Sequence, residues 1–117
     1  MRQTLLIVDD NEGFRSSARA LLETQGFDVV GEAADGQQAM IEVERLHPAI
    51  VLLDIQLPGE DGFDVAEHLA RRVDPPIVVL ISSRSSATYV RRMAMTTARA
   101  FVPKDRLTDG RLAEIVG

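Results

Sequence analysis

The stretch that decides the fold is Ile50-Val51-Leu52-Leu53-Asp54. Its four apolar residues are too few for an ordinary helix, and two of them are β-branched. A short run that is apolar throughout is typical of a strand buried on both faces, as in a parallel sheet. The run ends in Asp54, so the pattern predicts an acid at the carboxyl end of a central strand.

Comparable short runs lie on both sides of this stretch, at residues 5–8, 29–30, 77–81 and 100–102, and the second is the weakest. Apolar residues at helical spacing fill the intervals between the runs. The five expected helices contain Phe14, Ala18, Leu21 and Leu22; Gln38, after a cap at Asp35; Ala66, Leu69 and Ala70; Val90, Met93 and Ala94; and Leu112, Ile115 and Val116.

Turn residues mark where several of these helices end. Gly26 suits the left-handed position just past the first helix, and Pro48 closes the second. Strand and helix therefore alternate five times along the chain. This order predicts an α/β fold with a parallel sheet, helices on both faces and right-handed crossovers.

Composition excludes several classes of protein. The 117 residues fit one domain over 1–117, and there is no cysteine for a disulfide or a thiolate metal site. The apolar run before Asp9 is too short for a signal peptide or a membrane helix, so we expect a cytoplasmic protein without membrane contact. The net charge of -5 argues against direct binding of nucleic acid, although residues 84–117 hold 7 bases and 3 acids.

Polar residues follow the expected strands at one edge of the sheet. In open α/β sheets, ligands bind at the carboxyl ends of the strands. The residues at these ends are Asp9 and Asp10, Asp54, Ser82 and Ser83, and Lys104. Clustered carboxylates repel one another unless a cation lies among them, and oxygen ligands without His or Cys select a hard ion such as Mg²⁺.

Each of these residues also has a simpler interpretation when it is taken alone. An Asp after a strand is often a helix cap, and Asp9, Asp10 or Asn11 could cap the first helix. Lys104 alone could be solvated, and Ser82 could satisfy only a loop amide. Their convergence on one strand edge is what favours a functional site.

Four segments together resemble the receiver domain of bacterial two-component response regulators. They are Leu-Ile-Val-Asp-Asp-Asn at 6–11, Leu-Asp-Ile-Gln-Leu-Pro-Gly-Glu-Asp-Gly at 53–62, Leu-Ile-Ser-Ser at 80–83 and Phe-Val-Pro-Lys at 101–104. The resemblance covers essentially the whole chain. It implies a doubly wound, flavodoxin-like sheet of five parallel strands in the order 2-1-3-4-5.

The resemblance also implies a role for each residue of the site. Asp54 would be the phosphoacceptor, and Asp9, Asp10, Asp54 and the backbone carbonyl of Gln56 would bind Mg²⁺ or Mn²⁺. Ser82 and Lys104 would contact the phosphoryl group. Phe101 would be the switch aromatic, turning into space that Ser82 vacates behind the fourth strand. Position alone predicts a further role: Gln56 lies two residues beyond Asp54 and Arg84 two beyond Ser82, so both are expected to border the path of the attacking water and modulate the lifetime of the phosphoryl group.

Partners follow from the same resemblance. A sensor histidine kinase or a phosphotransfer protein would supply the phosphoryl group. The output would go to a separate partner or to a C-terminal effector domain. The surface formed by the fourth helix, the fifth strand and the last helix would transmit the signal, and two copies of the chain could also form a homodimer through it. Arg91, Arg92 and Arg99 lie in this basic part. The chain would catalyse its own phosphorylation and dephosphorylation without being a classified enzyme.

The sequence departs from the family pattern in three places. Family members usually have Pro after the lysine, joined by a cis bond, whereas Asp105 follows here and Pro103 precedes. Ala100 replaces the glycine common before the switch aromatic, and the last helix is short.

Three alternatives remain beside the phosphorylated receiver. A degenerate receiver would bind partners without being phosphorylated. A phosphohydrolase of related fold would usually have a cap domain and a second acid at position 56, where this chain has Gln56. A flavin-binding protein would need a phosphate loop after the first strand, where Asp9, Asp10 and Glu12 would repel phosphate.

Overall fold

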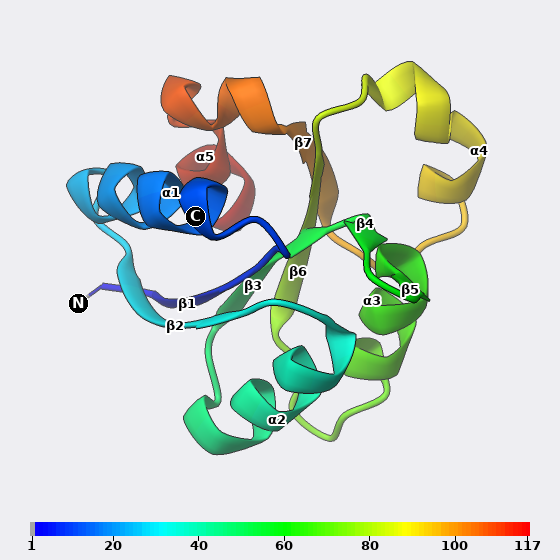
Figure 1. Cartoon of the computed structure of the whole chain (residues 1–117), viewed down its shortest axis with the longest axis horizontal. Helices are drawn as coiled ribbons and strands as arrows, with labels where there is room; N and C mark the ends of the chain where they lie inside the picture. Colours follow the sequence, from blue (N-terminus) through cyan, green and yellow to red (C-terminus); the bar gives the residue numbers. More distant parts are fainter. Residues whose placement is uncertain (1) are drawn as a thin grey trace.

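The computed structural model describes residues 2–117. Helices and strands alternate along the chain, as Figure 1 shows. The elements are β1 (Thr4–Val8), α1 (Glu12–Thr24), β2 (Asp28–Ala33), α2 (Gly36–Leu46), β3 (Ile50–Asp54), β4 (Gln56–Leu57), β5 (Glu60–Asp61), α3 (Gly62–Ala70), β6 (Ile77–Ser82), the 3-10 helix η1 (Ser86–Tyr89), α4 (Val90–Met93), β7 (Ala100–Pro103), the 3-10 helix η2 (Lys104–Asp109) and α5 (Arg111–Val116).

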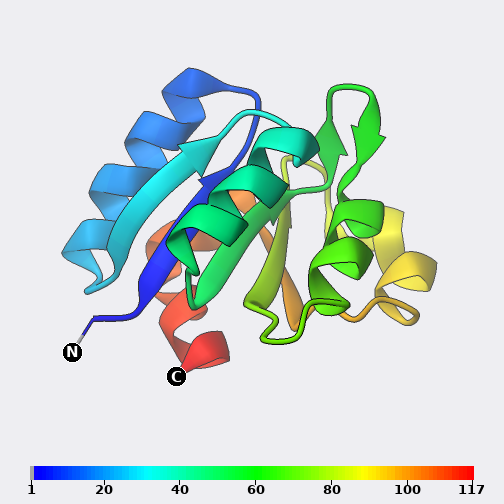
Figure 2. The same ribbon diagram turned by 90° about the horizontal axis from the view of Figure 1, so that it is seen from below.

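Five strands form one parallel sheet in the order β2-β1-β3-β6-β7. Counted along the chain, this is the expected order 2-1-3-4-5, so the predicted fold is confirmed. The sequence did not predict the short antiparallel hairpin of β4 and β5. Figure 2 shows this hairpin, in green, projecting beyond the sheet.

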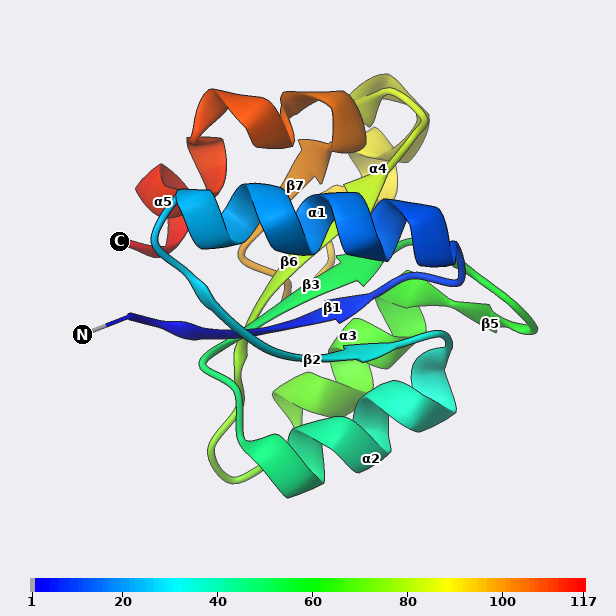
Figure 3. The same ribbon diagram turned by 60° about the vertical axis from the view of Figure 1, so that its left-hand side comes forward.

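Both faces of the sheet are covered, which explains why its strands are apolar throughout. On one face Val51 and Leu53 of β3 pack with α2 and α3, and on the other Ile50 and Leu52 pack with α1 and α5. All four side chains are fully buried. Figure 3 shows α1 and α5 on one side of the sheet and α2 and α3 on the other.

Helix ends follow the local sequence signals. The side chain of Asn11 accepts a hydrogen bond from Phe14 N, so Asn11 is the cap of α1. Asp35 accepts from Gln38 N at 2.8 Å, and the Gln38 side chain reaches back to Ala34 N at 2.9 Å. This is close to the predicted capping box. Gly26 has a φ of 99°, as expected just past α1.

The prediction for the fourth helix was partly wrong. Only Val90–Met93 is α-helical, and Val90 and Ala94, expected on its buried stripe, are exposed. The buried side chain of this segment is Tyr89, one residue earlier. Helix α5 is short, as expected. The peptide bond after Lys104 is trans, like every other bond described in residues 2–117, and in that range there is no helix long and apolar enough to cross a membrane.

Candidate functional site

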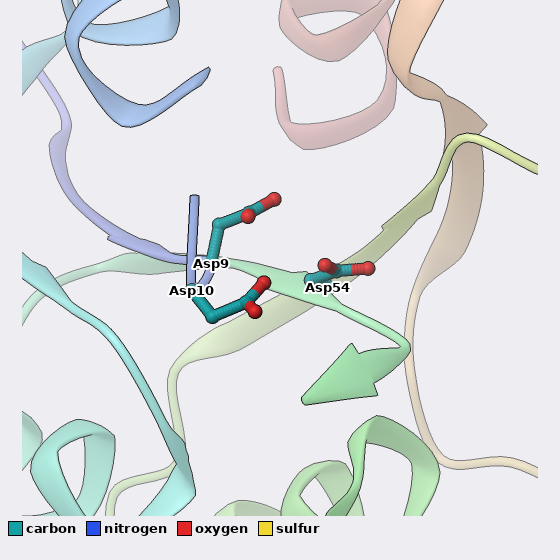
Figure 4. Close-up of side chains that lie close together, drawn as sticks. All are labelled: Asp9, Asp10 and Asp54. Atoms are coloured by element: carbon teal, nitrogen blue, oxygen red, sulfur yellow. The ribbon is translucent and has the colours of Figure 1, made fainter. Parts of the chain in front are cut away.

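Three carboxylates lie together at the carboxyl edge of the sheet. Strands β1 and β3 are neighbours, with Val8 opposite Leu53. An aspartate follows each of these residues, so Asp9 and Asp54 lie side by side. One oxygen from each of Asp9, Asp10 and Asp54 lies within 4.8 Å of the others. Figure 4 shows Asp9 and Asp10 just after β1 and Asp54 at the end of β3. Asp9 and Asp54 are buried and Asp10 is exposed.

Lys104 supplies the positive charge of the cluster. Its Nζ lies 2.6 Å from Asp9 Oδ2 and 3.4 Å from Asp54 Oδ2. It also lies 4.4 Å from the centroid of the Phe14 ring, a cation–π distance. Asp9 Oδ2 is buried, and this ion pair is its polar contact within residues 2–117. Burial lowers the pKa of Lys104, but the carboxylates of Asp9 and Asp54 outweigh this and hold it above the usual value.

Asp54 is the carboxyl group most perturbed by this environment. Burial raises the pKa of Asp54 to about 6, and the charge of Asp9 adds to the rise, although Gln56 N–H and Lys104 oppose it. Gln56 N donates to Asp54 Oδ1 at 3.1 Å. A raised pKa means that the folded protein binds this proton more tightly than the unfolded chain. The carboxyl group therefore favours folding near pH 4, and this contribution is lost as pH rises through about 6.

The residues of this cluster fit a hard divalent cation. The candidate ligands are carboxylate oxygens, with no His or Cys among them, which suits Mg²⁺ or Mn²⁺. A single ammonium faces two buried carboxylates, so negative charge remains for a cation to neutralise. The backbone of Gln56, expected to provide a carbonyl ligand, lies beside Asp54 through its N–H bond.

Ser82 ends β6, on the strand next to Asp54. It is fully buried, and its Oγ accepts a hydrogen bond from Arg84 N at 3.0 Å. Its Oγ also lies 3.4 Å from the hydroxyl oxygen of Tyr89. The sequence predicted Ser82 at this edge but did not single out Tyr89. The signal was available, because Tyr89 and Met93 are four residues apart and both face inward.

Phe101 lies on β7, opposite Leu80 of β6, and is partly buried. Its ring centroid lies 5.9 Å from that of Tyr89, and Tyr89 lies 5.9 Å from Phe63. We expect Phe101 to turn into space that Ser82 vacates behind β6. In this structure the Tyr89 side chain lies beside both residues, with its ring against Phe101 and its hydroxyl 3.4 Å from Ser82 Oγ.

Gln56 and Arg84 bridge the loops that follow β3 and β6. Both are exposed. With its amide oxygen toward the guanidinium, Gln56 accepts hydrogen bonds from Arg84 Nε and Nη2, both at 3.2 Å. The opposite amide orientation would place N–H against N–H, so the first orientation is the chemically sensible one.

Comparison with known proteins settles the family. Residues 5–116 match the model of the response regulator receiver domain. The chain belongs to this family. It is 37% identical over 101 residues to the transcriptional regulatory protein PdtaR of Mycobacterium tuberculosis, covering 86% of this chain and 48% of that protein. It is 42% identical over 106 residues to protein-glutamate methylesterase/protein-glutamine glutaminase 6 of Anaeromyxobacter dehalogenans, covering 88% of this chain and 30% of that protein.

Solved receiver domains have the same architecture. The receiver domain of the response regulator NarL from Mycobacterium tuberculosis superposes with a TM-score of 0.84 at 30% identity, covering 99% of this chain and 98% of that chain. The doubly wound, flavodoxin-like receiver fold is thus confirmed. The chain spans less than half the length of the two curated relatives described above. This receiver is a signalling unit of the two-component type, and some receivers occur within longer proteins that are enzymes.

Proposed function

We propose that this receiver domain, over residues 1–117, accepts a phosphoryl group on Asp54 and signals through the resulting change in its surface. One observation carries the proposal above all others. The carboxylate of Asp54 lies at the sheet edge where the carboxylates of Asp9 and Asp10 and the ammonium of Lys104 converge. The ammonium, together with a cation held by the carboxylates, would reduce the main barrier to the reaction, which is the repulsion between an anionic nucleophile and an anionic phosphoryl group.

The proposed reaction transfers a phosphoryl group from a phosphohistidine. An Asp54 oxygen attacks phosphorus, the P–N bond breaks, and its electron pair leaves with the imidazole, which takes up a proton. Lys104 pairs with one phosphoryl oxygen, and the Ser82 hydroxyl donates a hydrogen bond to another. Asp9, Asp10, Asp54 and the Gln56 carbonyl would hold Mg²⁺ or Mn²⁺, which supplies charge stabilisation when bound.

The proposal extends to partners and location. The donor would be a sensor histidine kinase or a phosphotransfer protein in the cytoplasm. The output would go to a separate partner or to an effector domain, without direct contact of this domain with nucleic acid or membrane. The surface of α4, β7 and α5 would transmit the signal, and a homodimer could form there. The net charge of -5 supports a protein partner over nucleic acid.

A small acyl phosphate with Mg²⁺ tests the acceptor. Intact mass is expected to increase by a single phosphoryl group, with the label stable in acid and labile in base, as for an acyl phosphate. Asp54→Asn is expected to abolish the increase, because an amide is not a phosphoryl nucleophile here. Asp64→Asn, an exposed aspartate of α3, is the control and should be labelled like the parent. Labelling that persists in Asp54→Asn would refute the assignment.

The Gln56–Arg84 bridge is expected to lengthen the life of the phosphoryl group by shielding it from water. Arg84→Ala should shorten the half-life of the phosphorylated protein by about fivefold, which corresponds to roughly 1 kcal/mol of barrier. Gln56→Ala should shorten it less, because Arg84 remains. If the two act as one bridge, the double variant should decay no faster than Arg84→Ala.

Dephosphorylation followed by intact mass after removal of the donor measures these half-lives. Arg91→Ala, another exposed arginine of the basic part, is the control and should decay like the parent. A longer half-life for Arg84→Ala would mean that the arginine assists hydrolysis instead. Strictly additive effects would mean that Gln56 and Arg84 act separately.

A further inference from the structure

Tyr89 is the only tyrosine of the chain, which has no tryptophan. It is 8% exposed, although its neighbours in residues 83–95 are exposed, apart from the half-buried Met93. This one side chain therefore anchors η1 and the start of α4 to the body of the protein. The other apolar side chains of the segment, such as Val90 and Met95, are exposed, so few buried contacts besides Tyr89 hold its position.

The Tyr89 side chain contacts Ser82 and Phe101, the two residues of the expected switch. Its ring packs between Phe63 of α3 and Phe101 of β7, with 5.9 Å between centroids on each side. Its hydroxyl lies 3.4 Å from Ser82 Oγ, and Ser82 is its hydrogen-bond partner within residues 2–117. A hydroxyl–hydroxyl distance of 3.4 Å is long, so a small shift of Ser82 breaks the contact.

We propose that Tyr89 is the positioning residue that couples Ser82 to Phe101 and to the surface of α4. The inference rests on the proposed phosphorylation of Asp54. When Ser82 turns its hydroxyl to the phosphoryl group, the buried Tyr89 hydroxyl loses its partner. A buried polar group without a partner is unfavourable, so Tyr89 leaves its interior position for solvent. Phe101 then moves into the space, and η1 loses its buried anchor.

The surroundings determine which part of the segment is released. Farther along α4, the guanidinium of Arg92 lies 4.3 Å from the centroid of the Phe63 ring and pairs with Asp61. These contacts are at the surface and do not involve Ser82. The end of α4 near Arg92 therefore stays attached to α3, while η1 moves with Tyr89. Movement of Phe101 alone is not sufficient, because the Tyr89 ring already lies beside it.

Tyrosine fluorescence tests this coupling, because it reports on Tyr89 alone. Acrylamide quenching is measured before and after treatment with a small acyl phosphate and Mg²⁺, with intact mass recorded on the same samples. Quenching is expected to increase several-fold in the phosphorylated protein and to stay unchanged in Asp54→Asn. Ser82→Ala should be quenched strongly even without phosphodonor, since its Tyr89 hydroxyl has no partner. Ser82→Thr keeps a hydroxyl, so without phosphodonor its Tyr89 should be quenched as weakly as in the parent.

A second variant tests the coupling if Ser82→Ala does not fold. Tyr89→Phe keeps the ring but has no hydroxyl to leave unpaired, so phosphorylation should proceed while the ring stays inside. The methyl resonance of Met93, which packs on this core, should shift on phosphorylation of the parent and lose most of that shift in Tyr89→Phe. A purely structural role of the ring would leave this response intact.

The outcomes separate this inference from the proposed function. A complete mass increase with unchanged quenching overturns the role of Tyr89 and leaves phosphorylation standing. A full Met93 response in Tyr89→Phe also overturns it. No mass increase in the parent overturns the proposed function and, with it, the inference.

Discussion

Lys104→Met is expected to destabilise the metal-free protein by about 3 kcal/mol, because it leaves buried carboxylates without their cation. Lys104 Nζ lies 2.6 Å from Asp9 Oδ2, and Asp9 is fully buried. Methionine keeps most of the apolar stem, so the contact with Phe14 is largely retained. Phosphoryl uptake by Asp54 should also slow strongly, because the charge that offsets the incoming phosphoryl oxygens is lost.

Denaturant unfolding at neutral pH, with a chelator and then with Mg²⁺, measures this effect. Mg²⁺ should restore part of the lost stability, since a divalent cation can compensate the same carboxylates. The loss should shrink at low pH, because burial raises the pKa of Asp54 to about 6 and the protonated carboxyl group no longer needs a cation.

Arg106→Met provides the matched control. Arg106 pairs with Asp109 at 3.4 Å, but both side chains are exposed, so this change should cost less than about 1 kcal/mol. Equal losses for the two variants would mean that the Lys104 ammonium does not stabilise the buried acids.

The strands of the sheet were predictable because buried parallel strands leave a strong local signal, whereas their order came from the family resemblance. Residues 50–53 are buried on both faces of the sheet, and an unbroken apolar run predicts such burial. The same burial makes Asp54, at the end of the run, conspicuous. The hairpin of β4 and β5 left no such signal, since each strand has two residues and Leu57 alone among them is buried.

The fourth helix was misjudged because one helical turn is too short to define a face. Helical spacing allows two buried stripes, one of Val90, Met93 and Ala94 and the other of Tyr89 and Met93. Packing of Tyr89 against Phe101 selects the second. Tertiary contact thus overrides a periodicity that spans four residues.

The site was predicted as a set of charges, but its pairings were not. Spacing along the chain placed Lys104 near the acids, yet it could not tell whether Asp9 or Asp54 would be the nearer partner. The distances of 2.6 Å and 3.4 Å favour Asp9. The bridge between Gln56 and Arg84 depends on how two loops meet, which no local pattern encodes.

Gly62 shows how a residue outside the charge cluster holds Asp54 in place. It is the first residue of α3, and its N–H donates to Ile55 O at 2.8 Å. A Cβ at position 62 would lie 2.4 Å from the carbonyl oxygen of Asp54 and 2.6 Å from Ile55 Cα. Both are backbone atoms, so a methyl group fits only if α3 moves away from the end of β3.

Gly62→Ala is therefore expected to destabilise the protein by about 3 kcal/mol, at the upper end for overpacking, and to slow phosphoryl uptake. Gly13→Ala, in the first turn of α1, is the matched control. Its Cβ would meet only the Asn11 side chain, at 3.3 Å, so stability should change by less than about 0.5 kcal/mol. Denaturant unfolding and the rate of labelling by an acyl phosphate measure both effects. If Gly62→Ala were as stable as Gly13→Ala and labelled at the parent rate, the end of β3 would be able to shift without cost, and close packing of α3 could not be what positions the carboxylate of Asp54.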